Sequence, residues 1–210
     1  MYTLYYAPGA CSMAVHIALN ECNVPFKLEN VVHSSGQGRT PDYLKINPRG
    51  QVPLLVDDNQ VIMEGAAQLI HILEKNHSPL LPASDPARAK ALEWLMFGNA
   101  TLHPAYSRVF FLKKNGPQDA TKDLLMEAAV SSINSLWNEI ENQLAQSSYV
   151  AGNDVTIADI LLTVIANWSP NVPKPIMIGP KTKALFQRII VRPSYKKALE
   201  TEHVTYKMAA

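Results

Sequence analysis

The sequence has little cysteine, little net charge and no long hydrophobic run. Its 210 residues include two cysteines, and 19 lysines and arginines nearly balance 18 aspartates and glutamates, which leaves a formal net charge of +1. Two cysteines do not form a disulfide framework, so the composition agrees with a reducing compartment. A nearly neutral chain gives no reason to expect nucleic acid or an anionic membrane as the main partner.

Targeting and membrane signals are also missing from the sequence. The amino terminus, MYTLYYAPG, lacks the basic head and the apolar run of a signal peptide. No segment stays apolar for the roughly 20 residues that a membrane-spanning helix needs. We therefore expect a cytoplasmic protein with neither a membrane nor a nucleic-acid partner. The 47% of hydrophobic residues is typical of a globular chain with a large core.

The first third of the chain alternates strands and helices. Turn chemistry at 57–59 separates two short apolar runs and predicts a β-hairpin. The order of elements, βαβ followed by ββα, predicts a small α/β unit. The expected elements are strands at 2–6 and 27–32, a helix at 12–21, a helical turn near Tyr43, hairpin strands at 52–56 and 61–63, and a helix at 65–76.

The rest of the chain has helical periodicity. Residues 76–86 are rich in proline and polar side chains and indicate a domain boundary. Beyond them, apolar residues recur at helical spacing from Ala87 onward. Thr156 and Asp159 have the spacing of a capping box, which predicts a helix that begins at residue 157. Because that helix is almost wholly apolar, we expect it to run through the middle of an all-α bundle.

Cys11 lies between the first predicted strand and the first predicted helix. Pro8 and Gly9 form a turn, and the helical pattern begins at Ser12. The unpaired amides and the positive end of the helix dipole favour a thiolate at such a position. Cys22 would lie roughly 16 Å farther along the same helix, too far for a disulfide, and we interpret it as a packing residue.

Several motifs together resemble the cytosolic glutathione transferases, and most closely the beta class known mainly from bacteria. They are YYAPGACSMAVHIALNE, INPRGQVPLL, MEGAAQLIHIL, VTIADILL and RPSYKKAL, and their order and spacing span nearly the whole chain. The resemblance implies the glutathione transferase fold, an α/β thioredoxin-like N-terminal domain plus an all-α C-terminal helical bundle. The implied boundaries are 1–78 for the glutathione-binding domain, 79–86 for the linker and 87–210 for the bundle that forms the electrophile cleft. A homodimer is implied as well.

The same resemblance implies roles for individual residues. Cys11 matches the active-site cysteine beside the glutathione sulfur, and His103 matches a histidine that faces this cysteine. Val52 and Pro53 match a step with a cis peptide bond whose backbone pairs with the cysteinyl part of glutathione. A proline by itself predicts a trans bond, so this expectation rests on the resemblance alone. Glu64 and Gly65 match the acidic residue and the helix start that hold the γ-glutamyl end. We expect Ala10, Arg39, Gln51 and Asn99 as other glutathione contacts, and the aromatic residues Tyr106, Phe110 and Trp168 as walls of the electrophile cleft.

Three features depart from the class. Met96 stands where the class usually has an asparagine, and Asn99, one helical turn later, is the candidate substitute. Pro104 replaces a common lysine and predicts a kink that displaces both His103 and Tyr106. The loop 33–40 lacks the usual lysines, so that Arg39 is its one fixed cation.

The function predicted from these features is conjugation of the glutathione thiolate to small hydrophobic electrophiles. Glutathione is then a co-substrate, and no metal or permanently bound cofactor is expected. Two alternatives remain open: monothiol thiol–disulfide exchange through Cys11, and a non-enzymatic binding protein on the transferase fold. Tyr5, Tyr6 and Ser12 remain alternative catalytic groups, because related classes use a tyrosine or a serine in this region.

Overall fold

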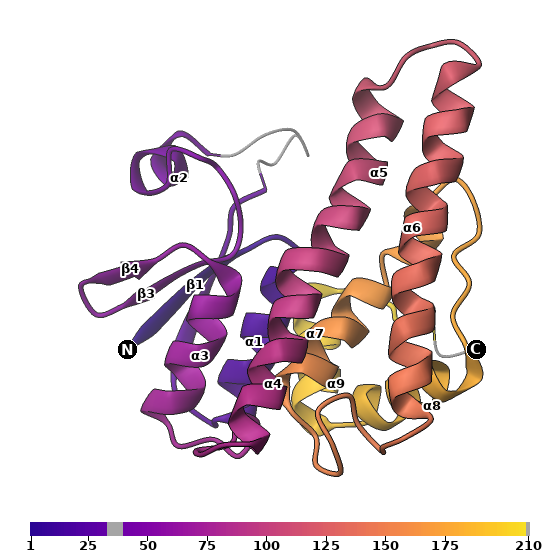
Figure 1. Ribbon diagram of the computed structural model, residues 1–210. Coiled ribbons are helices and arrows are strands. Elements are labelled where there is room, and N and C mark those ends of the chain that lie inside the picture. The colour runs from indigo at the N-terminus through magenta and orange to yellow at the C-terminus, as the bar shows by residue number, and fades with distance from the viewer. Residues whose placement is uncertain (33–39, 209–210) are drawn as a thin grey trace. The chain divides into compact units, whose positions relative to one another are not determined.

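The computed structural model describes residues 1–32 and 40–208 (Figure 1). The chain divides into two compact units. The first unit comprises Met1–Ala83 together with Arg192–Thr205, and the second comprises Ser84–Val191 together with the residues from Tyr206 on. The predicted boundaries at 78 and 87 stay predictions. Residues 192–205, which we expected in the helical domain, lie instead with the first unit.

The first unit is built on a four-stranded mixed sheet in the order β2-β1-β3-β4. Strand β1 is parallel to β2 and antiparallel to β3, with Tyr2 opposite both Phe26 and Asp57. This arrangement confirms the predicted thioredoxin-like fold class. The elements are β1 (Tyr2–Tyr6), α1 (Ser12–Glu21), β2 (Phe26–Asn30), α2 (Pro41–Ile46), β3 (Leu54–Asp57), β4 (Gln60–Ile62) and α3 (Gly65–Lys75).

Helix α1 is the buried centre of the first unit. Eight consecutive residues, Ser12 to Leu19, are buried, because α3 and the late helix α9 (Pro193–Glu202) both pack against α1. Two hydrogen bonds of 2.7 Å from Arg192 to the Glu21 carboxylate fasten the start of α9 to the end of α1. Such a bidentate pair fixes geometry as well as contributing energy. It accounts for the place of α9 in the first unit, although the helices that directly precede α9 in sequence belong to the second.

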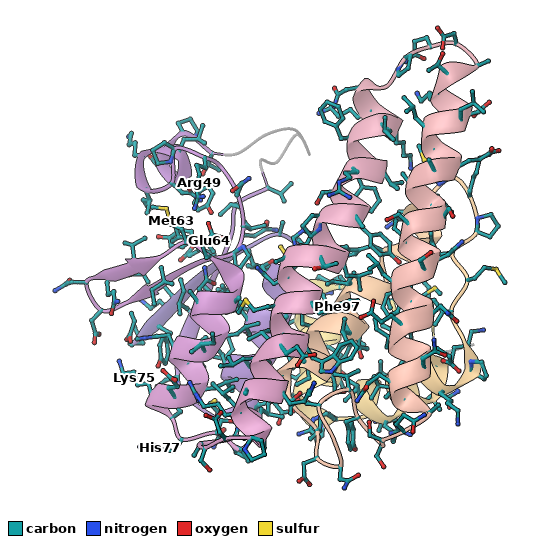
Figure 2. The ribbon with its side chains drawn as sticks, in the orientation of Figure 1. Arg49, Met63, Glu64, Lys75, His77 and Phe97 are labelled. Carbon is teal, nitrogen blue, oxygen red and sulfur yellow. The ribbon has the colours of Figure 1, made fainter. Side chains whose placement is uncertain are left out.

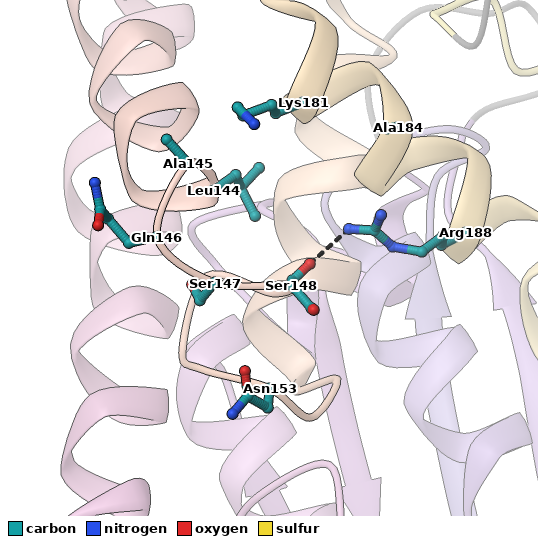
Figure 3. A pocket seen from close by; sticks show the side chains of 9 residues that line it. All are labelled: Leu144, Ala145, Gln146, Ser147, Ser148, Asn153, Lys181, Ala184 and Arg188. Atoms are coloured by element: carbon teal, nitrogen blue, oxygen red, sulfur yellow. Dashed lines mark hydrogen bonds between the residues drawn. The ribbon is translucent and has the colours of Figure 1, made fainter.

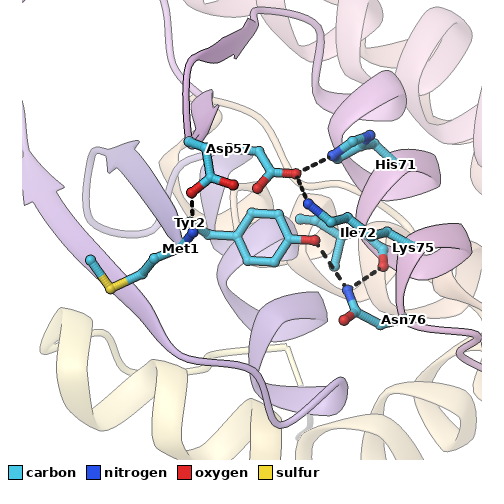
Figure 4. A network of polar contacts seen from close by, with 8 residues as sticks. Met1, Tyr2, Asp57, His71, Ile72, Lys75 and Asn76 are labelled. Atoms are coloured by element: carbon cyan, nitrogen blue, oxygen red, sulfur yellow. Dashed lines mark hydrogen bonds and ion pairs between the residues drawn. The ribbon is translucent and has the colours of Figure 1, made fainter.

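A polar network ties α3 to the sheet at the Asp57 end of β3 (Figure 4). The nearly buried Asp57 carboxylate lies 2.8 Å from His71 Nε2 and accepts a 2.5 Å hydrogen bond from Lys75. Burial opposes ionisation here, but the bonds from Lys75 and His71 outweigh it and hold the pKa of Asp57 below its usual range. Asn76 donates to the Tyr2 hydroxyl at 3.2 Å. His71 thus has a structural partner.

The second unit is helical, and its central helix α7 is buried at every position from Ile157 to Ala166. The predicted capping box is present: Asp159 accepts the Thr156 amide at 2.8 Å and also the Val150 amide at 3.0 Å. Helices α5 and α6 run side by side (Figure 1). No helix in the described part of the chain combines the length and apolarity that crossing a membrane requires. The elements are α4 (Ala87–Met96), η1 (Phe97–Leu102), α5 (His103–Asn115), α6 (Thr121–Leu144), α7 (Ile157–Ala166), η2 (Ser169–Asn171) and α8 (Pro180–Ile190).

The expected disturbance at Pro104 takes the form of a π-helical turn. Segment η1 is wound as a π-helix, and the His103 amide bonds to the Gly98 carbonyl five residues earlier. Pro104 follows immediately, at the second position of α5, so the wider turn absorbs the missing amide without ending the helical run. A side chain at Gly98 would approach Leu161 of α7 to 3.0 Å, which explains the close packing of this turn on the central helix.

Candidate active site

Cys11 lies in the loop that joins β1 to α1, directly before the first residue of the helix. Its side chain is half-buried, and its thiol donates to the Val52 carbonyl at 3.3 Å. Gly9 takes a positive φ of 67° in this loop, a conformation that glycine adopts without strain. Ser12 is fully buried and donates to the Ala7 carbonyl at 3.2 Å, so its hydroxyl closes the loop.

The position of Cys11 in the sequence predicted a lowered thiol pKa, and this prediction is wrong in direction. Burial raises the pKa of the Cys11 thiol to about 11, and the amides of Cys11 and Ser12 only partly offset this effect. Sequence position predicted the amide contribution correctly and missed the desolvation, which depends on the surrounding fold. At neutral pH Cys11 is therefore a protonated thiol, able to donate a hydrogen bond.

A buried carboxylate supports the loop from the side of α9. Glu202 accepts the Gly9 amide at 2.9 Å through Oε2, and its Oε1 lies 2.9 Å from His16 Nδ1. The side chains of Glu202 and His16 are 0% and 1% exposed. Burial and the neighbouring Glu202 charge raise the pKa of Tyr6. Sequence reasoning missed Glu202, because no local pattern connects it with a glycine 193 positions earlier.

The segment opposite Cys11 has the backbone that the resemblance implies. The Val52–Pro53 peptide bond is cis. Gln68 of α3 is fully buried and donates to the carbonyls of Pro53 and Ile62, at 3.0 and 2.8 Å. Gln68, which the sequence did not single out, therefore fixes the position of this segment.

The turn before Val52 is organised by Asn47. This side chain is 1% exposed; its Nδ2 donates to the Gln51 carbonyl at 2.8 Å and its Oδ1 accepts the Arg49 amide at 3.2 Å. Tyr43 of α2 also donates to the Gln51 carbonyl. The Gln51 side chain remains exposed. A buried side chain that satisfies both ends of a turn gives the turn one conformation.

Glu64 directly precedes α3, and its side chain makes no capping bond to the helix amides. It is exposed and instead accepts a 3.0 Å hydrogen bond from Arg49 Nη1 (Figure 2). Gly65 is the first residue of α3. The predicted contact Ala10 lies in the Cys11 loop, where its amide donates to the Ala7 carbonyl at 3.1 Å. Arg39 lies outside the described residues.

Four aromatic site candidates form one cluster in the second unit. Trp168 lies at its centre, with ring centroids 4.9 Å from His103, 5.9 Å from Tyr106 and 6.5 Å from Phe110. Burial lowers the pKa of His103, so its imidazole is neutral at pH 7. His103 and Cys11 belong to different units, and their pairing stays a prediction. Asn99 lies in η1 and is half-buried.

Tyr106 differs from the expected cleft wall. It is 0% exposed, and its hydroxyl bonds with Ser169 at 2.6 Å and Trp137 at 2.8 Å. Burial raises the pKa of Tyr106 to about 12. A side chain with no exposed surface and a fully engaged hydroxyl presents nothing to a ligand in this structure. The structure therefore places Tyr106 in the core of the helical unit.

Outside the candidate site, the described residues form a polar pocket but no cluster of metal ligands. Among the described residues, no group of three or more histidine, cysteine, aspartate or glutamate side chains is arranged to hold a metal ion. A polar pocket of about 520 Å³ in the second unit contains no predicted site residue (Figure 3). It is lined by Leu144, Ala145, Gln146, Ser147, Ser148, Asn153, Lys181, Ala184 and Arg188.

Two family models match the chain. Residues 9–76 match the N-terminal domain of glutathione S-transferases, and residues 101–193 match the C-terminal domain of the same proteins. Among curated proteins, glutathione S-transferase GST-4.5 of Xanthomonas campestris is 32% identical over 201 residues, 95% of this chain and 98% of that protein. Glutathione S-transferase GstA of Escherichia coli O157:H7 is 30% identical over 203 residues, 95% of this chain and 98% of that protein.

Solved structures have the same architecture. A glutathione S-transferase from Xylella fastidiosa superposes with a TM-score of 0.86 at 28% identity and covers 98% of this chain and 100% of that one. A sphingomonad glutathione S-transferase complexed with glutathione gives 0.79 at 31% identity, over 97% and 100%. A beta-class enzyme from Sphingomonas chungbukensis gives 0.78 at 27% identity, again over 97% and 100%.

Proposed function

Because this chain belongs to the glutathione S-transferase family, we propose that it conjugates the thiolate of glutathione to small hydrophobic electrophiles. The glutathione sulfur attacks an electrophilic carbon, the carbon's leaving group departs with its bonding electrons, and the thiol proton passes to solvent. The observation that carries the proposal is the position of the Cys11 thiol, which lies directly before α1 and donates a hydrogen bond to the Val52 carbonyl at 3.3 Å.

In this mechanism Cys11 is a hydrogen-bond donor. A free glutathione thiol, with a pKa near the cysteine value of about 8.5, is mostly protonated at neutral pH. When glutathione binds, the Cys11 thiol turns from the Val52 carbonyl to the glutathione sulfur and stabilises its anion. The amides at the start of α1 and the helix dipole act in the same direction. A thiol that stays protonated suits this role and does not suit a nucleophile.

Glutathione itself is held by the first unit in this proposal. The backbone of Val52 pairs with the cysteinyl part, as an added strand would. Gln51, Ala10 and Arg39 contribute further contacts. The γ-glutamyl end meets Glu64 and the free amides at Gly65, where the helix start favours a carboxylate. The buried bonds from Gln68 and Asn47 support this assignment, because they hold the backbone in place before the ligand arrives.

We propose that the electrophile binds to the aromatic cluster of the second unit. Neutral His103 and half-buried Phe110 offer an aromatic surface that is backed by the buried Trp168, and Asn99 on the π-helical turn adds a polar contact. We further propose the beta class, supported by the similarity to the Sphingomonas chungbukensis enzyme, together with a homodimer and a cytoplasmic location.

The first test is calorimetric titration of reduced glutathione into the reduced protein. The expected dissociation constant lies between about 1 µM and 1 mM. The rate of conjugation to an aryl halide, measured against pH, should report the pKa of the bound glutathione thiol. This pKa should lie below about 8.5 in the wild type and should be higher in Cys11→Ala. The absence of both binding and turnover in the wild type would overturn the proposal and favour a non-enzymatic protein.

Cys11→Ser separates conjugation from exchange. A serine hydroxyl still donates a hydrogen bond, so conjugation of the aryl halide should persist in this variant. If Cys11 were the nucleophile of a monothiol exchange, the serine variant would have no disulfide reductase activity. Loss of aryl halide conjugation in Cys11→Ser, with glutathione binding intact, would contradict the donor role.

A further inference from the structure

An ion pair links the turn before Val52 to the start of α3. Arg49 Nη1 and Glu64 Oε1 are 3.0 Å apart, and these two side chains are 50% and 68% exposed (Figure 2). Among the described residues, this bond is the one hydrogen bond that the Arg49 side chain makes. A guanidinium has five N–H donors, and a carboxylate accepts at two oxygens. The pair therefore offers unused donors and an unused acceptor to a ligand, side by side.

Both backbones that carry the pair are fixed independently of any ligand. The Arg49 amide donates to Asn47 Oδ1 at 3.2 Å, and Gly50, at a φ of 61°, donates its amide to the Asn47 carbonyl at 2.9 Å. On the other side, the Glu64 carbonyl accepts the Gln68 amide at 3.0 Å as part of the first turn of α3. The two charged side chains thus extend from rigid positions into solvent.

The pair has the charge pattern that complements an amino acid end group. An α-amino acid carries an ammonium and a carboxylate on a single carbon, so its binding site needs a negative and a positive group close together. Glu64 and Arg49 supply these charges beside the free amides of α3, and a guanidinium matches a carboxylate in shape. Because an exposed ion pair contributes little to stability, replacing it with two ion pairs to a ligand costs little free energy.

We propose that Arg49 is a specificity-determining residue that binds the α-carboxylate of the γ-glutamyl group, while Glu64 binds the ammonium on the same carbon. This inference rests on the proposed function. It names Arg49 as the residue that recognises the γ-glutamyl end of glutathione and so contributes to the selection of this peptide. It assigns to Arg49 a direct contact with substrate, in addition to its bond with Glu64.

Substrate analogues distinguish direct contact from a merely supporting role. We would compare glutathione with γ-aminobutyryl-cysteinylglycine, which lacks the α-carboxylate, and with glutaryl-cysteinylglycine, which lacks the ammonium. Arg49→Gln should raise the dissociation constant and the KM for glutathione by about three- to tenfold, the range typical of one exposed charge-assisted contact. The same substitution should change binding of the decarboxylated analogue by less than about twofold.

Glu64→Gln provides the reciprocal measurement. It should weaken glutathione binding by a similar factor and leave the binding of glutaryl-cysteinylglycine nearly unchanged. Lys45→Gln is the matched control for loss of one positive charge, since Lys45 is exposed on α2 and pairs with Asp42. This variant should bind all three peptides like the wild type. Because Arg49, Glu64 and Lys45 are exposed, the variants should also melt at the wild-type temperature.

Each outcome decides the assignment. If Arg49→Gln weakens the decarboxylated analogue as much as glutathione, Arg49 only orients Glu64 and the proposed contact is wrong. Wild-type affinity of Arg49→Gln for glutathione would also overturn it, while leaving the proposed function intact. If the wild type binds none of the three peptides, the proposed function itself fails, and the specificity assignment fails with it.

Discussion

The buried Glu202 provides the sharpest test of how the active-site loop is held. Glu202→Ala removes the acceptor for the Gly9 amide and the partner of His16, both at 2.9 Å and both inside the first unit. A buried polar group that loses its hydrogen-bond partner costs about 1–3 kcal/mol, and Glu202→Ala removes the partner of both the Gly9 amide and His16 Nδ1. We therefore expect Glu202→Ala to lower the free energy of unfolding by about 2–6 kcal/mol.

Thermal denaturation followed by circular dichroism measures this loss. For a chain of this size, each kcal/mol corresponds to about 2–4 °C in Tm, so the variant should melt roughly 10 °C below the wild type. Urea unfolding should show a lower midpoint with an unchanged slope. Because Gly9 lies two residues before Cys11, the KM for glutathione should rise as well.

Glu200→Ala is the matched control, because Glu200 lies on the same helix and is exposed. It removes an equal charge without touching the loop and should melt within about 1 °C of the wild type, as surface substitutions usually do. If Glu202→Ala also melts within that range, Glu202 does not support the Cys11 loop and the reasoning from its buried hydrogen bonds is refuted.

Three further predictions follow from the same structure. Thr156→Ala, which removes the N-cap side chain of α7, should reduce the free energy of unfolding by about 1–2 kcal/mol, and an unchanged urea midpoint would contradict this. Because the pKa of Asp57 is lower in the folded state than its unfolded value of about 3.9, Asp57 stabilises the fold above about pH 3.9, and this stability is lost as the pH falls through the pKa of the folded state. Asp57→Asn should therefore flatten the acid side of a plot of Tm against pH. A plot parallel to that of the wild type would contradict this. Cys11 should react slowly with iodoacetamide at pH 7 and faster as pH rises toward about 11, so fast alkylation at pH 7, seen in the wild type and absent in Cys11→Ala, would refute the protonated thiol.

Local patterns predicted most elements of the fold. Strand Tyr2–Tyr6 and helix Ser12–Glu21 begin and end where the apolar pattern and the turn residues predicted. The hairpin strands lie at Leu54–Asp57 and Gln60–Ile62, shifted by one or two residues from the predicted runs. These elements depend on side-chain periodicity and turn chemistry, both of which are local and therefore visible in a sequence.

The candidate site was predictable only in part. The resemblance implied that Cys11 and the Val52–Pro53 step both contact the cysteinyl part of glutathione, and these roles stay predictions. In the structure the two segments meet through the 3.3 Å bond from the Cys11 thiol to the Val52 carbonyl. The supports Gln68 and Glu202 were not predicted. A glutamine inside a helix and a glutamate near the end of one carry no sequence signal, because their importance comes from backbone groups that are distant in sequence.

The sequence by itself determined where the chain turns, which residues cap α7 and which segments are helix or strand, because each of these depends on neighbours within a few positions. The tertiary structure alone decided three other matters: that α9 packs against α1, that Tyr106 is in the core, and that the Cys11 thiol is protonated. The physical reason is common to all three. Burial is set by segments from distant parts of the chain, and desolvation by those segments outweighs the local effect of the helix amides at Cys11.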